Sequence, residues 1–382
     1  MTRDRIAVID RSRLVSSARV RDGFYSTFVV RKASRHLTRL ALRLGLRPNE
    51  VTVASMVVAI AAALLFARGH WATTVAAAVL LQLSLVIDCV DGEVARYTGR
   101  FTAVGAWLDG VGDRLKEYSV YAGLAAGYDA WALAAALLVV QVYRHHVDFG
   151  FSANRTDASD GENRIAALSE RTNERPAVMW AKRALIMPIG ERWLVISVVS
   201  VAAGGRAVFW TLLVTCGLAA GYTTAGRVLR ALAQPHSPLD PAQLSVMTAL
   251  LPPPAEQLPA SVSRGRLAGW LPALVRSAEL AVLLVVAARQ EGDLMPAAFW
   301  LATVVALDGY DLVYRLRQTQ RPPARWRRIV LLGGLARLAV ALVIVLGAST
   351  SARTGVVVLA SAIALVCVVE VTGWLRSAGS AA

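Results

Sequence analysis

Four aspartates fall in two pairs within one stretch of the chain, residues 88–113. Asp88 and Asp91 are three residues apart, and Asp109 and Asp113 are four apart. On a helix, both spacings place the two carboxylates of a pair on one face. Carboxylates beside apolar sequence are costly unless a cation or a partner neutralises them. Because hard oxygen ligands favour Mg²⁺, Mn²⁺ or Ca²⁺ over zinc, the pattern predicts a divalent-metal site.

Small residues and one arginine accompany the acidic pairs. Gly92, Ala95 and Gly105 would let a ligand or a facing helix approach the backbone closely. Arg96 supplies a fixed cation that suits a phosphate. The alternative to a metal site is that the four acids are solvated or paired at helix ends, but their fixed spacing favours the site.

The complete string, D-x2-D-G-x2-A-R-x8-G-x3-D-x3-D, resembles without departure the signature of the CDP-alcohol phosphotransferases, also called CDP-alcohol phosphatidyltransferases. The resemblance in activity covers about residues 20–230. It implies a membrane enzyme that cleaves the phosphoanhydride of a CDP-alcohol, passes the phospho-alcohol group to the hydroxyl of a second alcohol and releases CMP. The C-terminal half resembles an uncharacterised membrane extension found beside such domains in actinobacterial proteins, which implies no activity.

The resemblance also implies roles for individual residues. Asp88, Asp91 and Asp109 match the metal ligands of the family. Asp113 matches the general base that deprotonates the attacking hydroxyl, and it is also counted among the metal ligands. Two Mg²⁺ or Mn²⁺ ions held by these aspartates would neutralise the diphosphate and stabilise the leaving CMP. The residues expected in the nucleotide site are Gly92, Ala95, Arg96, Gly105, Pro48 and Thr52.

The substrates are less closely defined. Three basic residues, Arg155, Lys182 and Arg183, suit an acceptor phosphate, although Lys182 and Arg183 would serve equally as membrane-flanking anchors. The lead-in 22–24, followed by Arg31-Lys32, resembles family branches related to di-myo-inositol-phosphate-phosphate and phosphatidylinositol-phosphate synthases. A polyol phosphate such as inositol phosphate or glycerol phosphate is therefore the expected acceptor. CDP-diacylglycerol is the default donor, and a soluble CDP-polyol is the alternative.

Composition predicts an all-α polytopic membrane protein, since 56% of the 382 residues are hydrophobic and many lie in long apolar runs. Residues 24–46 predict a basic amphipathic helix along the inner membrane surface. Ten spans are predicted, six before residue 230 and four after it: 51–68, 71–90, 103–124, 127–144, 192–204, 207–227, 267–288, 294–312, 328–348 and 354–375.

These elements predict four parts of the chain. They are a cytoplasmic lead-in (1–24), a six-helix phosphotransferase bundle with its amphipathic juxtamembrane helix (25–232), a Pro-rich linker (233–263) and a C-terminal four-helix membrane domain (264–382). Asp308 and Asp311 in the last part lack a second acidic pair, so we interpret them as polar residues at a helix end.

The net charge of +15 comes largely from arginines that flank apolar spans. The positive-inside rule then places the motif at the cytoplasmic face of the cell membrane, in contact with membrane lipids. Nucleic-acid binding is not expected, because the chain lacks aromatic stacking platforms. A non-catalytic scaffold or a cation-coupled transporter is the alternative, although no second half mirrors the motif. Relatives of this kind are often dimers, so a homodimer stays open.

Overall fold

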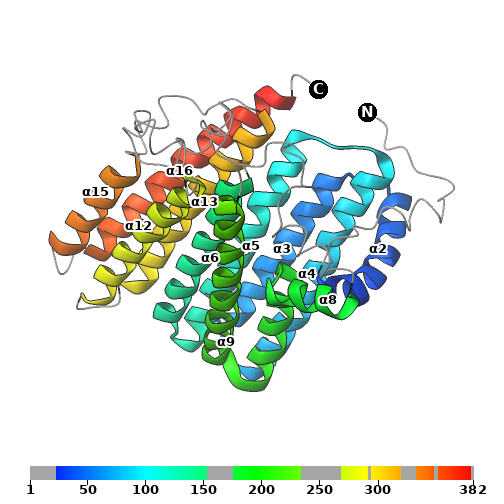
Figure 1. The fold of residues 1–382 in the computed structure, drawn as a ribbon, viewed down its shortest axis with the longest axis horizontal. Coiled ribbons are helices and arrows are strands. Elements are labelled where there is room, and N and C mark those ends of the chain that lie inside the picture. The colour runs from blue at the N-terminus through cyan, green and yellow to red at the C-terminus, as the bar shows by residue number, and fades with distance from the viewer. Residues whose placement is uncertain are drawn as a thin grey trace. The chain divides into compact units, whose positions relative to one another are not determined.

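The computed structural model describes residues 23–152, 175–233, 268–290, 294–319, 333–347 and 352–379, and every regular element within these ranges is helical (Figure 1). The predicted all-α class is confirmed. Most of the predicted lead-in, nearly all of the predicted linker and Arg155 lie outside the described residues.

The chain divides into two compact units. Unit 1 comprises Met1–Leu133 and Pro176–Thr215, and unit 2 comprises Ala134–Arg175 and Cys216–Ala382. Each unit is described by itself below. The limits predicted from sequence for the phosphotransferase bundle and the C-terminal domain stay a prediction.

Unit 1 contains the acidic motif. Its described helices are η1 (Ser26–Val30), α2 (Arg31–Arg43), α3 (Pro48–Phe66), α4 (Trp71–Thr98), α5 (Ala103–Tyr128), α8 (Pro176–Leu185) and the first part of α9 (Ile189–Ala233). Helix α3 packs against both α4 and α5, and α2 packs against α4 (Figure 1). The motif therefore runs from the end of α4 to the start of α5, where α3 supports both.

Local sequence sets the ends of these three helices. Helix α3 begins at Pro48, whose fixed φ suits the first helical position, and the Glu50 carboxylate accepts the Arg47 backbone N–H at 3.1 Å. Helix α4 ends at Gly99, which adopts the left-handed conformation with φ 70°. Helix α5 begins after Thr102, whose hydroxyl accepts the Gly105 backbone N–H at 2.9 Å.

Glycines allow α5 to lie directly on α3. A Cβ added at Gly123 would lie 2.1 Å from the Ala63 carbonyl oxygen, and one at Gly127 would lie 2.1 Å from the Phe66 carbonyl oxygen. Since any side chain at these positions would clash with backbone, small residues set the spacing of the two helices.

Helix α9 is interrupted at Gly204, where φ is 80° and ψ is 171°. This break falls at the end of the predicted span 192–204 and just before the predicted span 207–227. The ring of Tyr128 lies against the same point, because a Cβ on Gly205 would approach it to 2.4 Å.

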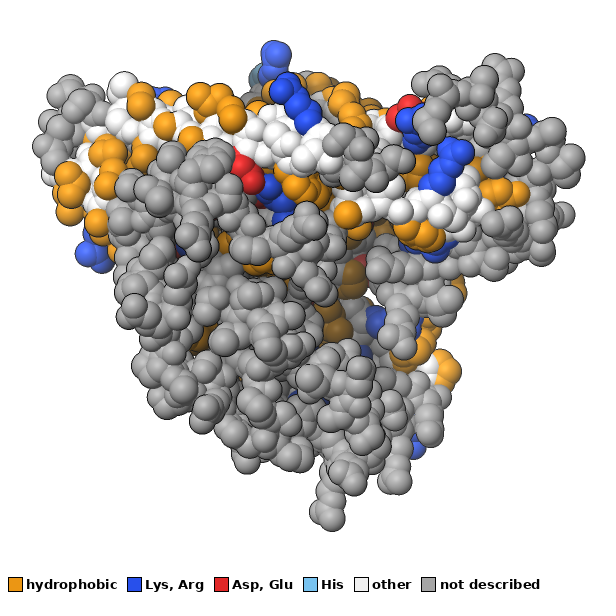
Figure 2. Space-filling view, turned by 90° about the horizontal axis from the view of Figure 1, so that it is seen from above, with side chains coloured by type: hydrophobic (Ala, Val, Ile, Leu, Met, Phe, Trp, Pro, Cys, Tyr) orange, Lys and Arg blue, Asp and Glu red, His pale blue; other side chains and the backbone are white. Residues whose placement is uncertain are grey.

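Six described helices are long and apolar enough to cross a membrane: α3, α4, α9, α12 (Leu271–Ala288), α13 (Met295–Thr319) and α16 (Ala352–Gly379). Hydrophobic side chains lie at the described surface beside Lys and Arg side chains, as one face of the molecule shows (Figure 2). The predicted polytopic membrane protein is confirmed. Three of the predicted spans correspond to described helices that are not among the six: α5, α6 (Trp131–Ser152) and α15 (Gly333–Gly347).

Unit 2 corrects the interpretation of Asp308 and Asp311. Helices α12, α13, α15 (Gly333–Gly347) and α16 pack together, and both aspartates lie within α13 rather than at its end. Arg337 of α15 pairs with Asp308 at 3.2 Å, and Arg315 pairs with Asp311 at 2.5 Å. These acids are therefore counter-ions inside a helix bundle.

Candidate metal and nucleotide site

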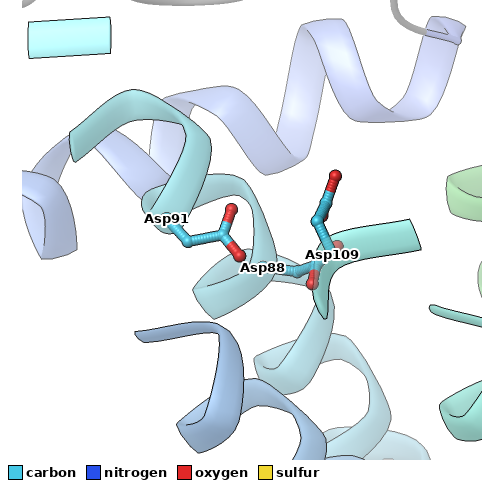
Figure 3. Close-up of side chains that lie close together, drawn as sticks. All are labelled: Asp88, Asp91 and Asp109. Carbon is cyan, nitrogen blue, oxygen red and sulfur yellow. The ribbon is translucent and has the colours of Figure 1, made fainter. Parts of the chain in front are cut away.

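Three of the four motif aspartates share one site. Asp88 and Asp91 project from α4 and Asp109 from α5, and one oxygen of each lies within 4.8 Å of the others. In Figure 3 the Asp91 carboxylate points toward Asp88 and Asp109. Asp91 is only 6% exposed, so its charge needs a compensating cation. Three converging carboxylates are the donor set that a hard divalent ion prefers, and these residues fit the predicted metal.

Hydroxyl groups of α3 hold two of these carboxylates in place. Thr52 donates to Asp91 Oδ2 at 2.5 Å, and Ser55 donates to Asp88 Oδ1 at 3.2 Å. The Ser55 carbonyl in turn accepts the Ser84 hydroxyl of α4 at 2.7 Å. Thr52 was predicted to belong to the nucleotide site, and its described contact is with a predicted metal ligand.

Asp113 lies one turn further along α5 and has a different partner. The Lys116 ammonium pairs with Asp113 Oδ1 at 2.9 Å and also with Asp88. Lys116 is fully buried, and its Nζ lies 5.6 Å from the ring centroid of Trp193. The structure thus separates Asp113 from the three-carboxylate cluster and links it to Asp88 through a lysine.

A second buried acid anchors this part of α5. Glu117 accepts two hydrogen bonds from Arg192 of α9, at 2.7 and 3.1 Å, and one from Arg114 at 2.8 Å. The Tyr121 hydroxyl donates to the same carboxylate at 2.7 Å. Because Glu117 is fully buried and multiply bonded, it fixes the rotation of α5 and therefore the position of Asp113.

A third buried acid joins α4 to the amphipathic helix. Arg31, Ser34 and Thr38 of α2 donate to the Glu93 carboxylate at 3.0, 2.8 and 2.6 Å. Arg31 belongs to the helix that the sequence predicted to be basic and amphipathic, and the structure buries its side chain. Helix α2 therefore contacts the motif helix through polar groups as well as through Leu42.

The predicted nucleotide-site residues lie at the ends of α3, α4 and α5. The Arg96 guanidinium lies over Gly92, since a Cβ there would be 3.0 Å from Arg96 Nη1. Gly105 leaves room for Asn49, whose side-chain oxygen would be 2.8 Å from an added Cβ. Pro48 is the first residue of α3, and Ala95 is half-buried on α4.

Two of the predicted acceptor residues are described. Lys182 and Arg183 are half-buried in the last turn of α8, and the Arg183 guanidinium stacks 4.8 Å from the Trp180 ring centroid. Trp180 in turn contacts Phe24 and Phe28, with centroid separations of 5.6 and 5.1 Å. These contacts fit the anchoring alternative for Arg183.

The start of the described chain docks on α4 and α9. The Tyr25 hydroxyl donates to Gln82 Oε1 at 2.8 Å, and the Tyr25 backbone N–H donates to Glu191 at 3.2 Å. Burial raises the pKa of the Tyr25 phenol above its ordinary value. The phenol therefore stays a hydrogen-bond donor at neutral pH.

Sequence reasoning missed Lys116, Glu117 and Glu93. Lys116 is three residues after Asp113, and Glu117 is four after it, so helical spacing placed both on the same side of α5. Glu93 lies inside the motif at a position where the family pattern accepts any residue. A charged side chain within the predicted span 103–124 was the available signal for Lys116 and Glu117, whereas Glu93 lies just after the predicted span 71–90 and gave no such signal.

Comparison with known proteins identifies two regions. The model of the CDP-alcohol phosphatidyltransferase family matches residues 46–201, and the model of a family of unknown function, DUF5941, matches residues 210–382. The first region contains the four motif aspartates and all of the predicted nucleotide-site residues. The second contains the four helices of unit 2 named above.

Several curated proteins are similar to the N-terminal half. Phosphatidylinositol phosphate synthase of Mycolicibacterium smegmatis is 34% identical over 147 residues, covering 37% of this chain and 64% of that protein. Its counterpart in Mycobacteroides abscessus is 30% identical over 178 residues, covering 45% and 77%. Archaetidylinositol phosphate synthase of Aeropyrum pernix is 36% identical over 101 residues, covering 26% and 48%.

The match to several of these relatives is partial, since the chain spans less than two thirds of the length of the M. smegmatis and A. pernix proteins. The M. abscessus protein is covered over more than three quarters of its length. The matched segment carries the complete aspartate motif, and the structure brings three of its carboxylates together between α4 and α5. On this evidence, the chain belongs to the CDP-alcohol phosphatidyltransferase family.

Proposed function

We propose that this chain transfers a phosphatidyl group from CDP-diacylglycerol to a hydroxyl of a polyol phosphate, with release of CMP. The observation that carries the proposal is the cluster of Asp88, Asp91 and Asp109, formed by the family motif on two packed helices. The names of the similar proteins, phosphatidylinositol phosphate synthase and archaetidylinositol phosphate synthase, favour inositol phosphate as the acceptor.

The family generally depends on divalent metal, and the cluster would hold Mg²⁺ or Mn²⁺. When bound, the metal neutralises the diphosphate of the donor and the leaving CMP. Thr52 and Ser55 keep Asp91 and Asp88 oriented for this role through their hydrogen bonds. The Arg96 guanidinium, held over Gly92, is placed to bind a donor phosphate.

Asp113 acts as the general base. It takes the proton from the acceptor hydroxyl as that oxygen bonds to the phosphorus that carries diacylglycerol. The bond from this phosphorus to the oxygen of the CMP phosphate breaks, and CMP leaves with the bonding electrons. Glu117 and Lys116 hold the part of α5 from which Asp113 projects.

We place this site at the cytoplasmic side of the cell membrane. Positive charges cluster in the loops on the motif side of the predicted spans. A lipid donor would enter from the bilayer, while the acceptor and CMP would exchange with the cytoplasm. A homodimer stays a prediction.

The proposal is tested by measuring CMP release from CDP-diacylglycerol by the purified full chain in detergent with Mg²⁺ or Mn²⁺. Inositol phosphate, glycerol phosphate and free inositol are compared as acceptors, with Asp91→Asn as the inactive control. We expect release that depends on metal and is greatest with inositol phosphate. Absence of CMP release with every acceptor and with a CDP-polyol donor would leave the transporter or scaffold alternative.

A further inference from the structure

Lys116 links the two acidic pairs of the motif. Its ammonium pairs with Asp88 from the first pair and with Asp113 from the second, at 2.9 Å in the latter case. It also donates to the Ser55 hydroxyl at 3.4 Å, and the Trp193 ring lies on another side. The head group is therefore enclosed by Asp88, Asp113, Ser55 and Trp193.

The lysine divides four carboxylates into two overlapping groups. Asp88, Asp91 and Asp109 offer oxygens within 4.8 Å of one another, whereas Asp113 is not part of that group. Asp88 belongs to both, because it faces the cluster and also receives the ammonium. A fixed positive charge thus lies where Asp88 and Asp113 would otherwise share a cation.

We propose, on the basis of the proposed function, that Lys116 replaces a second metal ion in this protein. One divalent ion binds to Asp88, Asp91 and Asp109, and the Lys116 ammonium neutralises Asp113 and pairs with Oδ1 of Asp88. Lys116 is a positioning residue, since it acts on the reaction through Asp113 and Asp88.

Three observations support this assignment. Lys116 is fully buried, so its charge cannot be carried into solvent without rearrangement of the site. The neighbouring acid, Glu117, is paired with Arg192 and Arg114. A divalent ion placed between Asp88 and Asp113 would also lie beside the ammonium, and like charges in a buried site repel strongly.

The proposal predicts the number of ions bound. Mn²⁺ alone is titrated into the purified full chain in detergent, and bound ions per chain are counted from the electron paramagnetic resonance signal of free Mn²⁺. We expect one ion in the natural protein and one in Lys116→Arg, which keeps the charge. Lys116→Met, which keeps the length and removes the charge, is expected to bind two. Lys32→Met, the same change at an exposed lysine of α2, is expected to bind one.

The outcomes separate this inference from the proposed function. Two ions in the natural protein, or one in a folded Lys116→Met variant, would overturn the role of Lys116 and leave the enzyme proposal intact if CMP is still released. No bound ion in the natural protein would overturn both. If Lys116→Met does not fold, the count in the natural protein and in Lys116→Arg decides alone.

Discussion

Thr52→Val tests whether the hydroxyl of α3 supports the metal site. Thr52 is buried and donates to Asp91 Oδ2 at 2.5 Å, and valine has nearly the same shape without the donor. A hydrogen bond to a charged group contributes about 1.5–3 kcal/mol. At about 1.4 kcal/mol per factor of ten, the loss corresponds to a roughly 10- to 150-fold weaker metal affinity. Removing an outer-shell partner of a metal ligand typically costs about 10- to 100-fold, which agrees.

The measurement is the dissociation constant for Mn²⁺ of the natural protein and the variant, together with the Mn²⁺ concentration that gives half-maximal CMP release. Thr52→Ser is the matched control, because it keeps the hydroxyl and should bind Mn²⁺ within a few-fold of the natural protein. The reasoning is refuted if Thr52→Val binds Mn²⁺ normally but binds CMP poorly. Thr52 would then contact the nucleotide, as the family resemblance alone implied.

Three further predictions concern the base and the buried ion pairs. Asp113→Asn should abolish CMP release while donor binding, measured by titration with CDP-diacylglycerol, stays largely intact; equal loss of binding would contradict the base role. Glu117→Gln should lower the free energy of unfolding, measured with denaturant, by about 3–5 kcal/mol, because it leaves the buried Arg192 without a full counter-charge. The control is Asp129→Asn, which removes the charge from an exposed pair with Arg206 and should have no measurable effect. Arg337→Met should destabilise unit 2 by a similar amount, and stability unchanged in the same assay would mean that Asp308 has another counter-ion.

Features set by neighbouring residues were predictable from sequence. Pro48 is a residue type that favours the first turn of a helix, and α3 begins there; Gly99 is the residue type that favours the left-handed end of a helix, and α4 ends beside it. The spacing of the aspartates also predicted their convergence for three of the four, since helical geometry fixes which side chains share a face. These inferences needed no knowledge of distant contacts.

Features set by distant residues were not predictable in the same way. Arg192 and Glu117 are 75 positions apart, and no local pattern indicates that they pair. The Lys116 ammonium pairs with Asp113 of α5 and also with Asp88 of α4. The contact with α4 cannot be inferred from the spacing of residues along α5. The same limit applies to Lys116 and Glu117 of α5, which are buried among partners from other helices that the local sequence does not reveal.

The attachment of α2 to Glu93 has a mechanical consequence. Separation of α2 from α4 would leave the fully buried Glu93 carboxylate and its three donors unpaired, which opposes movement of α2 away from the aspartates of α4. Leu40 of α2 and Leu44, the residue after its end, remain exposed and suit immersion among lipid headgroups. If α2 lies on a bilayer, the depth to which it is immersed sets the distance of the motif aspartates from the acyl chains. Under the proposed function, the donor diphosphate at the membrane–water boundary would then lie level with these carboxylates.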